Sequence, residues 1–324
     1  MPRLGAILCL LALAIAGCGS GGGDTDRPNE EASLLLDFTP NAVHAGIYLA
    51  TERAYDEADG VELEVRAPSA STDALKLLQA GRVDMAILDI NDLALAREQD
   101  RDVVGVMALV QRPLASVLAQ PAIARPRDLD GKRAGVTGLP SDVAVLRSVV
   151  QGDGGDPDSV KTTTIGFEAV KALLARRVDA ATAFWNVEGV ALQAQRPGMQ
   201  EFRVDDYGAP PYPELVLCVT RQTLDEKRPV VRATIRALRR GYGEAQNDPD
   251  SAVTALTTAN PDLDRVVADA QLDAVAPAFT AGADVYGQLR EDVLEQWAHW
   301  DLQFGIVKKP IDVDSAFDTS LAAP

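Results

Sequence analysis

The sequence predicts an α/β fold of two lobes with a helical C-terminal part. Up to residue 220, short apolar runs alternate with amphipathic stretches, a pattern typical of strands alternating with helices. From residue 228 onward, apolar residues recur at helical spacing instead. The chain has 324 residues, of which 47% are hydrophobic and 24% are charged. This is a globular composition in a chain longer than a typical domain, so we expect two lobes.

The N-terminus predicts a signal peptide and a lipid anchor. Arg3 precedes an apolar run that is too short to span a membrane and fits a signal-peptide core. Ile15-Ala16-Gly17-Cys18 resembles the bacterial lipobox, in which the cysteine is lipidated and becomes the first mature residue. An ordinary secretory signal cut nearby is the alternative. We predict a signal peptide over 1–17, lipidation of Cys18, a flexible Gly-rich and polar tether over 18–32, and a position on the extracytoplasmic face of the cell membrane.

The elements expected after the tether follow one another in regular alternation. The expected strands are 33–38, 61–65, 84–88, 103–110, 115–120, 132–138, 160–166, 178–184 and 214–220. The expected helices between them are 44–54, 71–80, 91–99, 141–150, 167–177 and 187–195. Further helices are expected within 228–246, 249–259, 263–279 and 287–305.

Two proline-containing segments predict where the chain passes between the lobes. The first follows the strand-like run 115–120 and contains Pro121 and Pro126, and the second is the Pro-rich turn before the run 214–220. An insertion bounded by these crossings makes lobe II residues 120–212. Lobe I is then built from residues 33–119 and 213–324.

Charge and cysteine usage exclude several classes of protein. The formal net charge of −17 argues against a nucleic-acid partner and favours a neutral or cationic ligand. If residues 1–17 are removed and Cys18 is acylated, Cys218 is the remaining cysteine, so no intramolecular disulfide and no cysteine metal site is expected. Cys218 lies in an apolar strand-like run and is expected to be buried. The chain has two histidines, His44 and His299, which does not favour a histidine-rich metal site.

Five strand ends followed by helix starts predict a ligand site. Unpaired N–H groups and the positive end of the helix dipole lie at such positions, and ligands of open α/β sheets gather there. The five segments are 37–41 with His44, 68–72, 89–92, 137–142 and 184–188. Serine, aspartate and asparagine at these positions also serve as helix N-caps, so each segment alone has a structural alternative. Divided between two lobes, the five together predict one site in a cleft.

The chain as a whole resembles the extracytoplasmic solute-binding proteins of ABC importers. Within them it resembles the branch that binds pyrimidine precursors of thiamine, which is related to fungal thiamine-pyrimidine synthases. The resemblance is carried by residues 36–65, 73–88, 129–142, 175–192, 213–253 and 304–317. It implies a two-lobed, type II periplasmic-binding-protein-like fold whose cleft closes on the ligand by hinge motion.

The resemblance also implies which residues hold the ligand. Asp37 and Phe38 match the family's Asp-aromatic pair at the pocket wall, where the family usually has tryptophan in place of Phe38. Trp185 and Glu188 match an aromatic-x-x-acid feature of the second lobe. We expect the two aromatic rings to stack on a planar aminopyrimidine and the two carboxylates to accept its N–H groups.

Further ligand contacts are expected, each with a structural alternative. They are Asn41, His44, Asp89, Gly138, Pro140, Ser141 and Asp142. Phe38 could instead belong to the core, and Asp142 could be only a helix cap. His44 could be a ligand contact, a residue of the helix cap or a metal ligand, and we favour a hydrogen-bonding residue at the edge of the site.

Residue chemistry argues against an enzyme. The fungal synthases that the chain resembles anchor pyridoxal phosphate on a lysine, consume their own histidine and carry a cysteine-rich iron motif. The corresponding positions here hold Leu88 and Asp92, and the cysteine-rich segment is matched by Cys218 alone. No G-x-S-x-G elbow occurs. We therefore predict no catalytic residues, no cofactor and no metal.

The sequence thus predicts a monomeric lipoprotein that captures a thiamine-related pyrimidine and delivers it to separate permease and ATPase subunits. Another planar heterocycle such as riboflavin, or a small sulfonate or nitrate, is the alternative ligand. The small anions are disfavoured by the net charge and because no arginine is evident among the five strand ends. A thiamine-pyrimidine synthase is the alternative from another class.

Overall fold

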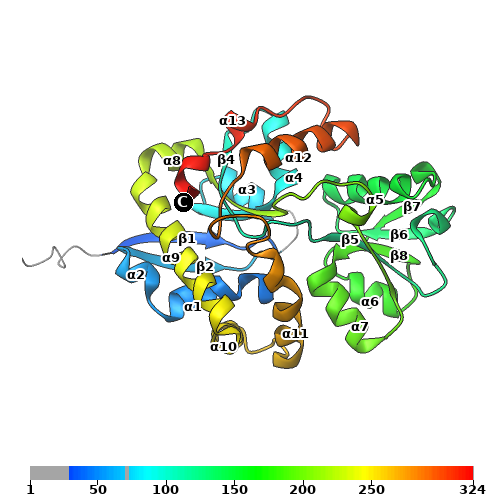
Figure 1. Ribbon diagram of the computed structural model, residues 1–324, viewed down its shortest axis with the longest axis horizontal. Helices are drawn as coiled ribbons and strands as arrows, with labels where there is room; N and C mark the ends of the chain where they lie inside the picture. The colour runs from blue at the N-terminus through cyan, green and yellow to red at the C-terminus, as the bar shows by residue number, and fades with distance from the viewer. Residues whose placement is uncertain (1–28, 70–72, 324) are drawn as a thin grey trace, which may run out of the picture.

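The computed structural model describes residues 29–69 and 73–323. The predicted signal peptide, Cys18, most of the tether, and residues 70–72 of one predicted strand end lie outside the described residues. The described chain forms two five-stranded sheets flanked by helices, side by side along the long axis (Figure 1). The α/β architecture of two lobes is therefore confirmed. We call the first sheet with its helices lobe I, and the second sheet with its helices lobe II.

The sheet of lobe I combines strands from both ends of the chain. In spatial order its strands are β2 (Val61–Arg66), β1 (Glu30–Leu35), β3 (Met85–Asp89), β10 (Leu215–Thr220) and β4 (Val103–Ala108). β2, β1 and β3 are parallel, whereas β10 runs antiparallel to both β3 and β4. The central strands are buried along most of their length, which explains their continuous apolar sequences.

The sheet of lobe II repeats this arrangement with an uninterrupted segment of chain. Its strands in spatial order are β7 (Lys161–Thr164), β6 (Arg133–Val136), β8 (Ala180–Phe184), β5 (Ala115–Ala119) and β9 (Gln200–Arg203). β7, β6 and β8 are parallel, and β5 runs antiparallel to β8 and β9. The fourth strand of each sheet, β10 in lobe I and β5 in lobe II, is therefore the first strand that the chain forms after crossing into that lobe.

Three sequence-based boundaries differ from the structure. β5 pairs with β8 and β9, so the run 115–119 belongs to lobe II although the predicted boundary was at residue 120. Pro121 and Pro126 follow β5 and mark loop structure within lobe II, and the crossings lie at 109–114 and 208–214. Residues 30–32, predicted as tether, pair with β2 as part of β1. β9 was missed because it is a short, mostly polar edge strand.

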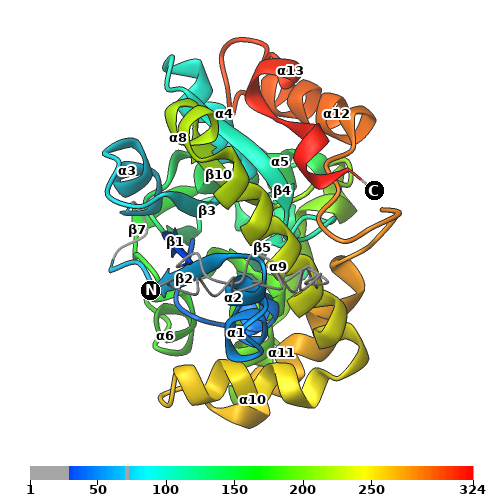
Figure 2. The same ribbon diagram turned by 90° about the vertical axis from the view of Figure 1, so that its left-hand side faces the viewer.

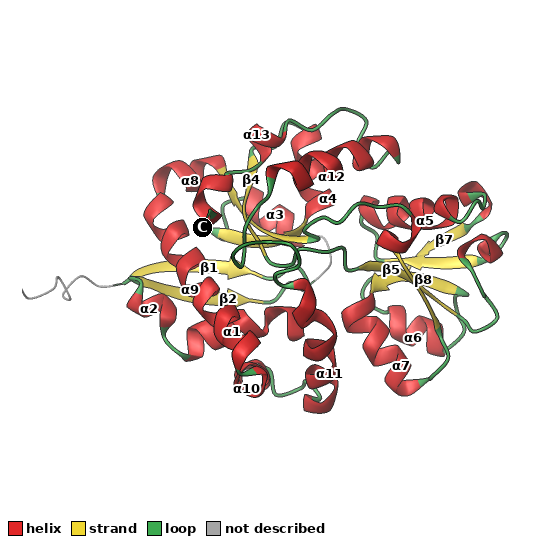
Figure 3. Cartoon of the chain, viewed as in Figure 1, coloured by secondary structure: helices red, strands yellow, loops and turns green. Residues whose placement is uncertain are grey.

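Helices cover both faces of each sheet (Figures 1 and 3). In lobe I they are α1 (Ala45–Glu52), α2 (Tyr55–Ala58), α3 (Asp73–Gln79), α4 (Ile90–Glu98), α8 (Arg221–Glu226), α9 (Arg228–Asn247), α10 (Pro249–Ala259), α11 (Arg265–Val275), α12 (Glu291–Gln303) and α13 (Val313–Ala316). In lobe II they are α5 (Pro140–Gly152), α6 (Ala169–Leu174) and α7 (Val190–Gln195). The turned view shows α1, α10 and α11 on one side of the lobe I sheet and α4, α12 and α13 on the other (Figure 2). The prediction that the C-terminal part is helical is confirmed.

Short helical turns complete the described chain. They are η1 (Ala42–His44), η2 (Pro126–Leu129), η3 (Pro157–Ser159), the π-helical turn η4 (Trp185–Gly189), η5 (Val204–Tyr207), η6 (Ala276–Ala278) and η7 (Thr319–Ala322). Within the described residues, no helix is both long enough and apolar enough to cross a membrane.

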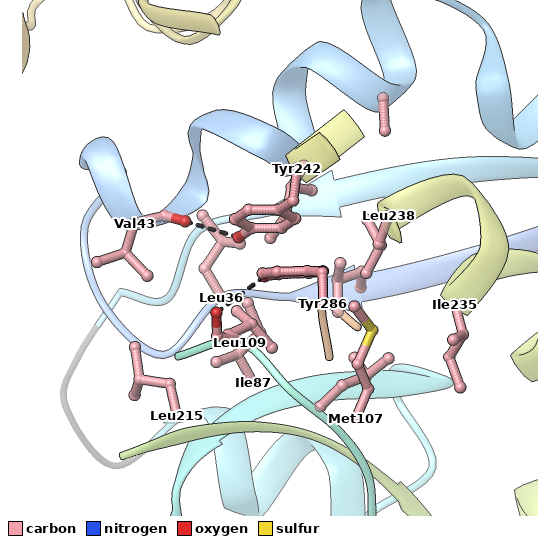
Figure 4. Packing of buried hydrophobic residues seen from close by; sticks show 14 of the residues in the cluster. Leu36, Val43, Ile87, Met107, Leu109, Leu215, Ile235, Leu238, Tyr242 and Tyr286 are labelled. Atoms are coloured by element: carbon pink, nitrogen blue, oxygen red, sulfur yellow. Dashed lines mark hydrogen bonds between the residues drawn. The ribbon is translucent and has the colours of Figure 1, made fainter. Parts of the chain in front are cut away.

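Tyr242 of α9 is a central residue of the lobe I core (Figure 4). Its hydroxyl donates a hydrogen bond of 2.6 Å to the carbonyl of Val43, just before α1. The ring of Tyr286 stacks on it at 4.3 Å between centroids, and the Tyr286 hydroxyl donates to the carbonyl of Leu109 at 2.9 Å. Because Leu109 begins the first crossing, this core joins α1, α9 and the path toward lobe II.

Helices α1 and α9 approach closely because glycines lie at their contact. A Cβ atom on Gly241 would lie 2.1 Å from the carbonyl oxygen of Gly46, and a Cβ on Gly46 would lie 2.4 Å from the Tyr242 ring. Neither position tolerates a methyl group unless the backbone of one helix shifts. Gly243, two residues further along α9, has nothing within 4 Å of the corresponding point.

We therefore expect opposite effects from the same substitution at two positions of α9. Gly241→Ala should lower the free energy of unfolding by about 1–3 kcal/mol, because the methyl group overpacks the α1 contact. Gly243→Ala should raise it by about 0.5–1 kcal/mol, because alanine favours the helix and meets no neighbour. Urea unfolding followed by circular dichroism measures both. Equal changes in the free energy of unfolding for the two variants would show that α1 and α9 do not pack closely at Gly241.

Candidate ligand-binding site

A cavity of about 250 Å³ lies between the lobes, where strands of both sheets end. Its polar and aromatic lining comprises Asp37, Phe38, Lys76, Asp89, Asp92 and Gln99 of lobe I and Ser116, Thr137, Ser141, Asp142, Phe167, Thr182, Phe184 and Glu188 of lobe II. Four of the five predicted strand ends therefore border one cavity. Of the fifth, residues 68–72, only Pro68 and Ser69 are described, and neither lines the cavity.

The strand end after β1 presents a fixed carboxylate. Asp37 Oδ1 accepts a hydrogen bond from His44 Nε2 at 2.9 Å, and the Asp37 side chain is 10% exposed. The backbone N–H of Asn41 donates to His44 Nδ1 at 3.2 Å, so Nδ1 carries the lone pair and Nε2 carries the proton. Asn41 in turn caps η1, with its Oδ1 accepting from the Val43 N–H at 2.9 Å.

His44 and Asn41 therefore lie behind the cavity wall. His44 is fully buried and Asn41 is nearly so, and neither belongs to the described lining. The expectation that His44 contacts the ligand at the edge of the site does not match this position. His44 instead donates to Asp37, which does line the cavity, and Asn41 holds the other nitrogen of the His44 ring.

Phe38 meets an aromatic residue of the other lobe. Its ring lies 4.2 Å from that of Phe167, centroid to centroid, with the planes 69° apart in an edge-to-face arrangement. Both rings line the cavity. Phe167 was not predicted as a site residue, although its place just after Gly166 at the end of β7 is the same strand-end signal used elsewhere.

The strand end after β6 is organised around Asp142. Its Oδ2 accepts from the Thr137 N–H at 2.7 Å and from the Thr137 hydroxyl. Gly138 takes a φ of +109°, a conformation that side chains rarely adopt, and so allows the tight turn into α5. Gly138 is not among the described lining residues, and Pro140 provides the first residue of α5. Burial raises the pKa of Asp142, and its hydrogen bonds with Thr137 and Gly138 oppose that rise.

A hydrogen bond crosses the cleft beside this turn. Ser141 Oγ of lobe II lies 3.2 Å from Asp92 Oδ1 of lobe I. Asp92 lines the cavity, and its pKa is raised well above the usual value, first by burial and then by Asp89 and Asp142. Together with the Phe38–Phe167 contact, this bond brings the lobes into direct contact across the cavity.

The strand end after β8 presents Phe184 and Glu188 to the cavity, but not Trp185. The Trp185 indole N–H donates to the carbonyl of Pro113 at 3.0 Å, and the guanidinium of Arg203 lies 4.0 Å from its ring centroid. Trp185 is therefore held against the first crossing. Its predicted partner in the motif, Glu188, accepts from the Phe184 N–H at 3.2 Å, and burial raises its pKa to about 7.

Asp89 ends β3 at the cavity wall and caps α4. Its Oδ1 accepts from the Asn91 N–H at 2.7 Å. Burial raises its pKa well above the usual value, and the neighbouring Glu214 adds to the rise. Glu214 was not predicted as a site residue. The signal available was a glutamate directly before an apolar, buried strand, where an acid needs a specific partner.

The lining is strongly acidic for its size. Five carboxyl groups face it, those of Asp37, Asp89, Asp92, Asp142 and Glu188, and Lys76 is the one basic residue among the described lining residues. Such a surface offers hydrogen-bond acceptors and negative charge beside aromatic faces. It suits a planar ligand with several N–H groups or a positive charge, and it opposes an anion.

Three positions match the lysine, the histidine and the cysteine-rich motif of the thiamine-pyrimidine synthases. Leu88 is buried within β3, and Cys218 is fully buried within β10, where burial raises the pKa of its thiol well above the usual value. Asp92 lines the cavity. Within the described part of the chain, no group of three or more histidine, cysteine, aspartate or glutamate side chains is arranged to hold a metal ion.

Comparison with known proteins relates this geometry to a family. The model of the family described as NMT1/THI5 like matches residues 41–252. A formylaminopyrimidine-binding protein from Halalkalibacterium halodurans is 30% identical over 319 residues, covering 96% of this chain and 97% of that protein. A 4-amino-5-hydroxymethyl-2-methylpyrimidine phosphate synthase from Legionella pneumophila is 24% identical over 241 residues, covering 71% of this chain and 74% of that protein.

A solved structure with the same fold is that of the alkanesulfonate-binding protein SsuA from Xanthomonas axonopodis pv. citri bound to MOPS. It superposes with a TM-score of 0.72 at 16% identity, covering 90% of this chain and 99% of that one. The fold is thus that of periplasmic solute-binding proteins, as the sequence predicted. With a family model matching more than half of its length and a 30% identical relative spanning nearly all of it, the chain belongs to the NMT1/THI5-like family.

Proposed function

We propose that this protein is the extracytoplasmic solute-binding component of an ABC importer and that it captures a thiamine-related aminopyrimidine. The observation that carries the proposal is the cavity between the lobes, where three phenylalanines and five carboxyl groups converge with one lysine among the described lining residues. The relative that matches nearly the full chain bears the name of a formylaminopyrimidine-binding protein, which agrees with this chemistry.

The cavity matches an aminopyrimidine group by group. A flat heteroaromatic ring stacks on the faces or edges of Phe38, Phe167 and Phe184. The exocyclic amino group and any protonated ring nitrogen donate to carboxylates, with Asp37 and Glu188 as the partners in lobe I and lobe II. Contacts from both lobes to one ligand would stabilise the closed form over an open one.

The same lining argues against the anionic ligands bound by proteins of this fold. A sulfonate or nitrate needs several N–H donors or arginines directed at its oxygens. The described lining offers Lys76 and hydroxyl groups, and five carboxyl groups would face the anion. Similarity of fold to an alkanesulfonate-binding protein therefore does not transfer that ligand.

The synthase alternative has weaker support from the residues. Leu88 offers no amine for a Schiff base, and Cys218 is buried within β10. Glu188, Asp37 and the phenylalanines describe a binding surface, and none of them is a nucleophile poised beside a base. We propose no cofactor and no catalytic role for these residues.

Delivery to a membrane importer completes the proposal. Cys18 would carry the lipid anchor and hold a monomeric protein at the outer face of the membrane. Separate permease and ATPase subunits would then receive the ligand. The Gly-rich segment after Cys18 would act as the tether.

A ligand screen tests the proposal directly. Formylaminopyrimidine and 4-amino-5-hydroxymethyl-2-methylpyrimidine should raise the melting temperature, because a ligand at 100 times its Kd adds about 2.7 kcal/mol to the free energy of unfolding. Taurine and nitrate should not. Thiamine, riboflavin and pyridoxal phosphate complete the panel. A shift with an anion but with no pyrimidine would refute the ligand, and an absorbing adduct with pyridoxal phosphate would favour the synthase.

Glu188→Gln should weaken aminopyrimidine binding on the order of tenfold, because a charge-assisted hydrogen bond is replaced by a neutral one. Isothermal titration calorimetry gives the Kd. The matched control is Glu168→Gln, because Glu168 is exposed, pairs with Lys171 and is not among the lining residues. Equal affinities of the two variants would remove Glu188 from the site.

Replacing Cys18 tests the anchor. In a bacterial host given a radiolabelled fatty acid, the wild-type protein should incorporate label and partition into membranes, whereas Cys18→Ala should do neither. Cys218→Ala is the control, because Cys218 is buried and should not be acylated. Label retained in Cys18→Ala would place the modification elsewhere and refute the lipobox assignment.

A further inference from the structure

The segment that carries Asp37 has no regular structure of its own. β1 ends at Leu35, η1 begins at Ala42, and residues 37–40 between them form bends. Asp37 lines the cavity from this segment, and its side chain is 10% exposed. An irregular segment leaves a side chain several orientations, and restricting it to one requires a specific contact. The orientation of the Asp37 carboxylate therefore depends on what bonds to it.

That contact comes from His44, whose ring is held on both sides. Nε2 of His44 lies 2.9 Å from Asp37 Oδ1, and the Asn41 backbone N–H donates to Nδ1 at 3.2 Å. Because a donor points at Nδ1, this nitrogen carries no proton, and the neutral ring carries its proton on Nε2. Both nitrogens are engaged, so neither is free to bind a metal ion, which was one of the alternatives for this residue.

The backbone that carries His44 is fixed by the core of lobe I. The carbonyl of Val43 accepts from the Tyr242 hydroxyl at 2.6 Å (Figure 4), and the N–H of Val43 donates to Asn41 Oδ1 at 2.9 Å. The His44 side chain itself is fully buried. Asp37 is thus bonded to a ring that cannot turn without breaking the turn η1 or its contact with α9.

The residue type at this position suits two tasks at once. Asn41 and His44 form a capping box around η1, in which the third residue reaches back to the N-cap N–H. That third residue is commonly glutamate or glutamine. A glutamate here would place a second carboxylate beside Asp37, which would be repulsive. A neutral imidazole accepts on one side and donates on the other, so it completes the cap and holds the aspartate.

We propose that His44 is a positioning residue of the ligand site, which in its Nε2–H tautomer holds Asp37 Oδ1 and leaves Asp37 Oδ2 as the oxygen that accepts from the ligand. Among the described residues, no group donates to Asp37 Oδ2. The consequence for the ligand rests on the proposed function. An amino group of an aminopyrimidine would meet one oriented acceptor from lobe I, with no rotation of the carboxylate left to restrict on binding.

The tautomer is tested on the free protein by NMR of the ring nitrogens. The chain has two histidines, and the exposed His299 is removed from the spectrum by His299→Gln. At about pH 8, where an imidazole is ordinarily neutral, Nδ1 of His44 should give the signal of an unprotonated nitrogen and Nε2 that of a protonated one. A proton on Nδ1 overturns the proposal, because the ring could then not donate to Asp37.

Two substitutions separate the roles of the two ring nitrogens. Counted in bonds from Cβ, the amide nitrogen of glutamine matches Nε2, and the amide oxygen of asparagine matches Nδ1. His44→Gln therefore keeps a donor for Asp37, whereas His44→Asn keeps only the acceptor for the Asn41 N–H. In calorimetry with formylaminopyrimidine, His44→Gln should stay within about threefold of the wild-type Kd, and His44→Asn should weaken binding by about tenfold. Equal Kd values for the two variants overturn the positioning role, and His299→Gln is the control that should leave Kd unchanged.

A double-mutant cycle tests whether His44 acts through Asp37. Asp37→Ala removes the carboxyl group, so adding His44→Asn to it should change Kd by less than about twofold. If His44→Asn still weakens binding by about tenfold in that background, the proposal is overturned, because His44 then affects the site by another route. If the wild type binds no aminopyrimidine, the proposed function fails, and the NMR spectrum still decides whether His44 holds Asp37 as described.

Discussion

Burying several carboxyl groups between two lobes is the constraint on which the rest of this structure depends. An unpaired buried carboxylate is costly, so each one needs fixed N–H or O–H donors. The chain supplies these donors where strands end and helices begin. Asp89 takes the Asn91 N–H, Asp142 takes the Thr137 N–H, and Glu188 takes the Phe184 N–H. The α/β layout thus produces an acidic site because it places such ends from two sheets around one cavity.

The second requirement is that the two crossings hold the lobes in fixed positions, so that lining residues from both lobes stay around the same cavity. Glu214 of the return crossing accepts from a backbone N–H at the end of the first crossing, and the Trp185 indole donates to Pro113 in that first crossing. Tyr286 holds the beginning of that crossing through Leu109 (Figure 4). Trp185, which the sequence suggests as a ligand contact, therefore holds the first crossing instead. The ring that faces the cavity is its neighbour Phe184.

The strand ends could be predicted from the sequence, but the direction of each side chain at those ends could not. Asp37, Phe38, Asp89, Asp142 and Glu188 follow apolar runs, and all of them line the cavity. His44 and Trp185 belong to the same motifs but do not line the cavity, because they lie in the helical turns η1 and η4, whose course the sequence pattern does not give. The contact between Phe38 and Phe167 depends on how the lobes meet, which no local pattern encodes. The β5 boundary was misplaced for a related reason, since proline marks a loop but not the sheet to which the preceding strand belongs.

Selectivity among proteins of this fold follows from what the strand ends carry. The backbone arrangement is shared with an alkanesulfonate-binding protein at 16% identity, so the sheets and crossings leave the ligand undetermined. Here the ends carry carboxyl groups whose pKa is raised by burial and by their negative neighbours. Under the proposed function, a ligand rich in N–H groups would donate hydrogen bonds to these oxygens, whereas an anion would not. The raised pKa values of these acids and the proposed preference for N–H donors therefore follow from one arrangement, in which several carboxyl groups are buried around one cavity.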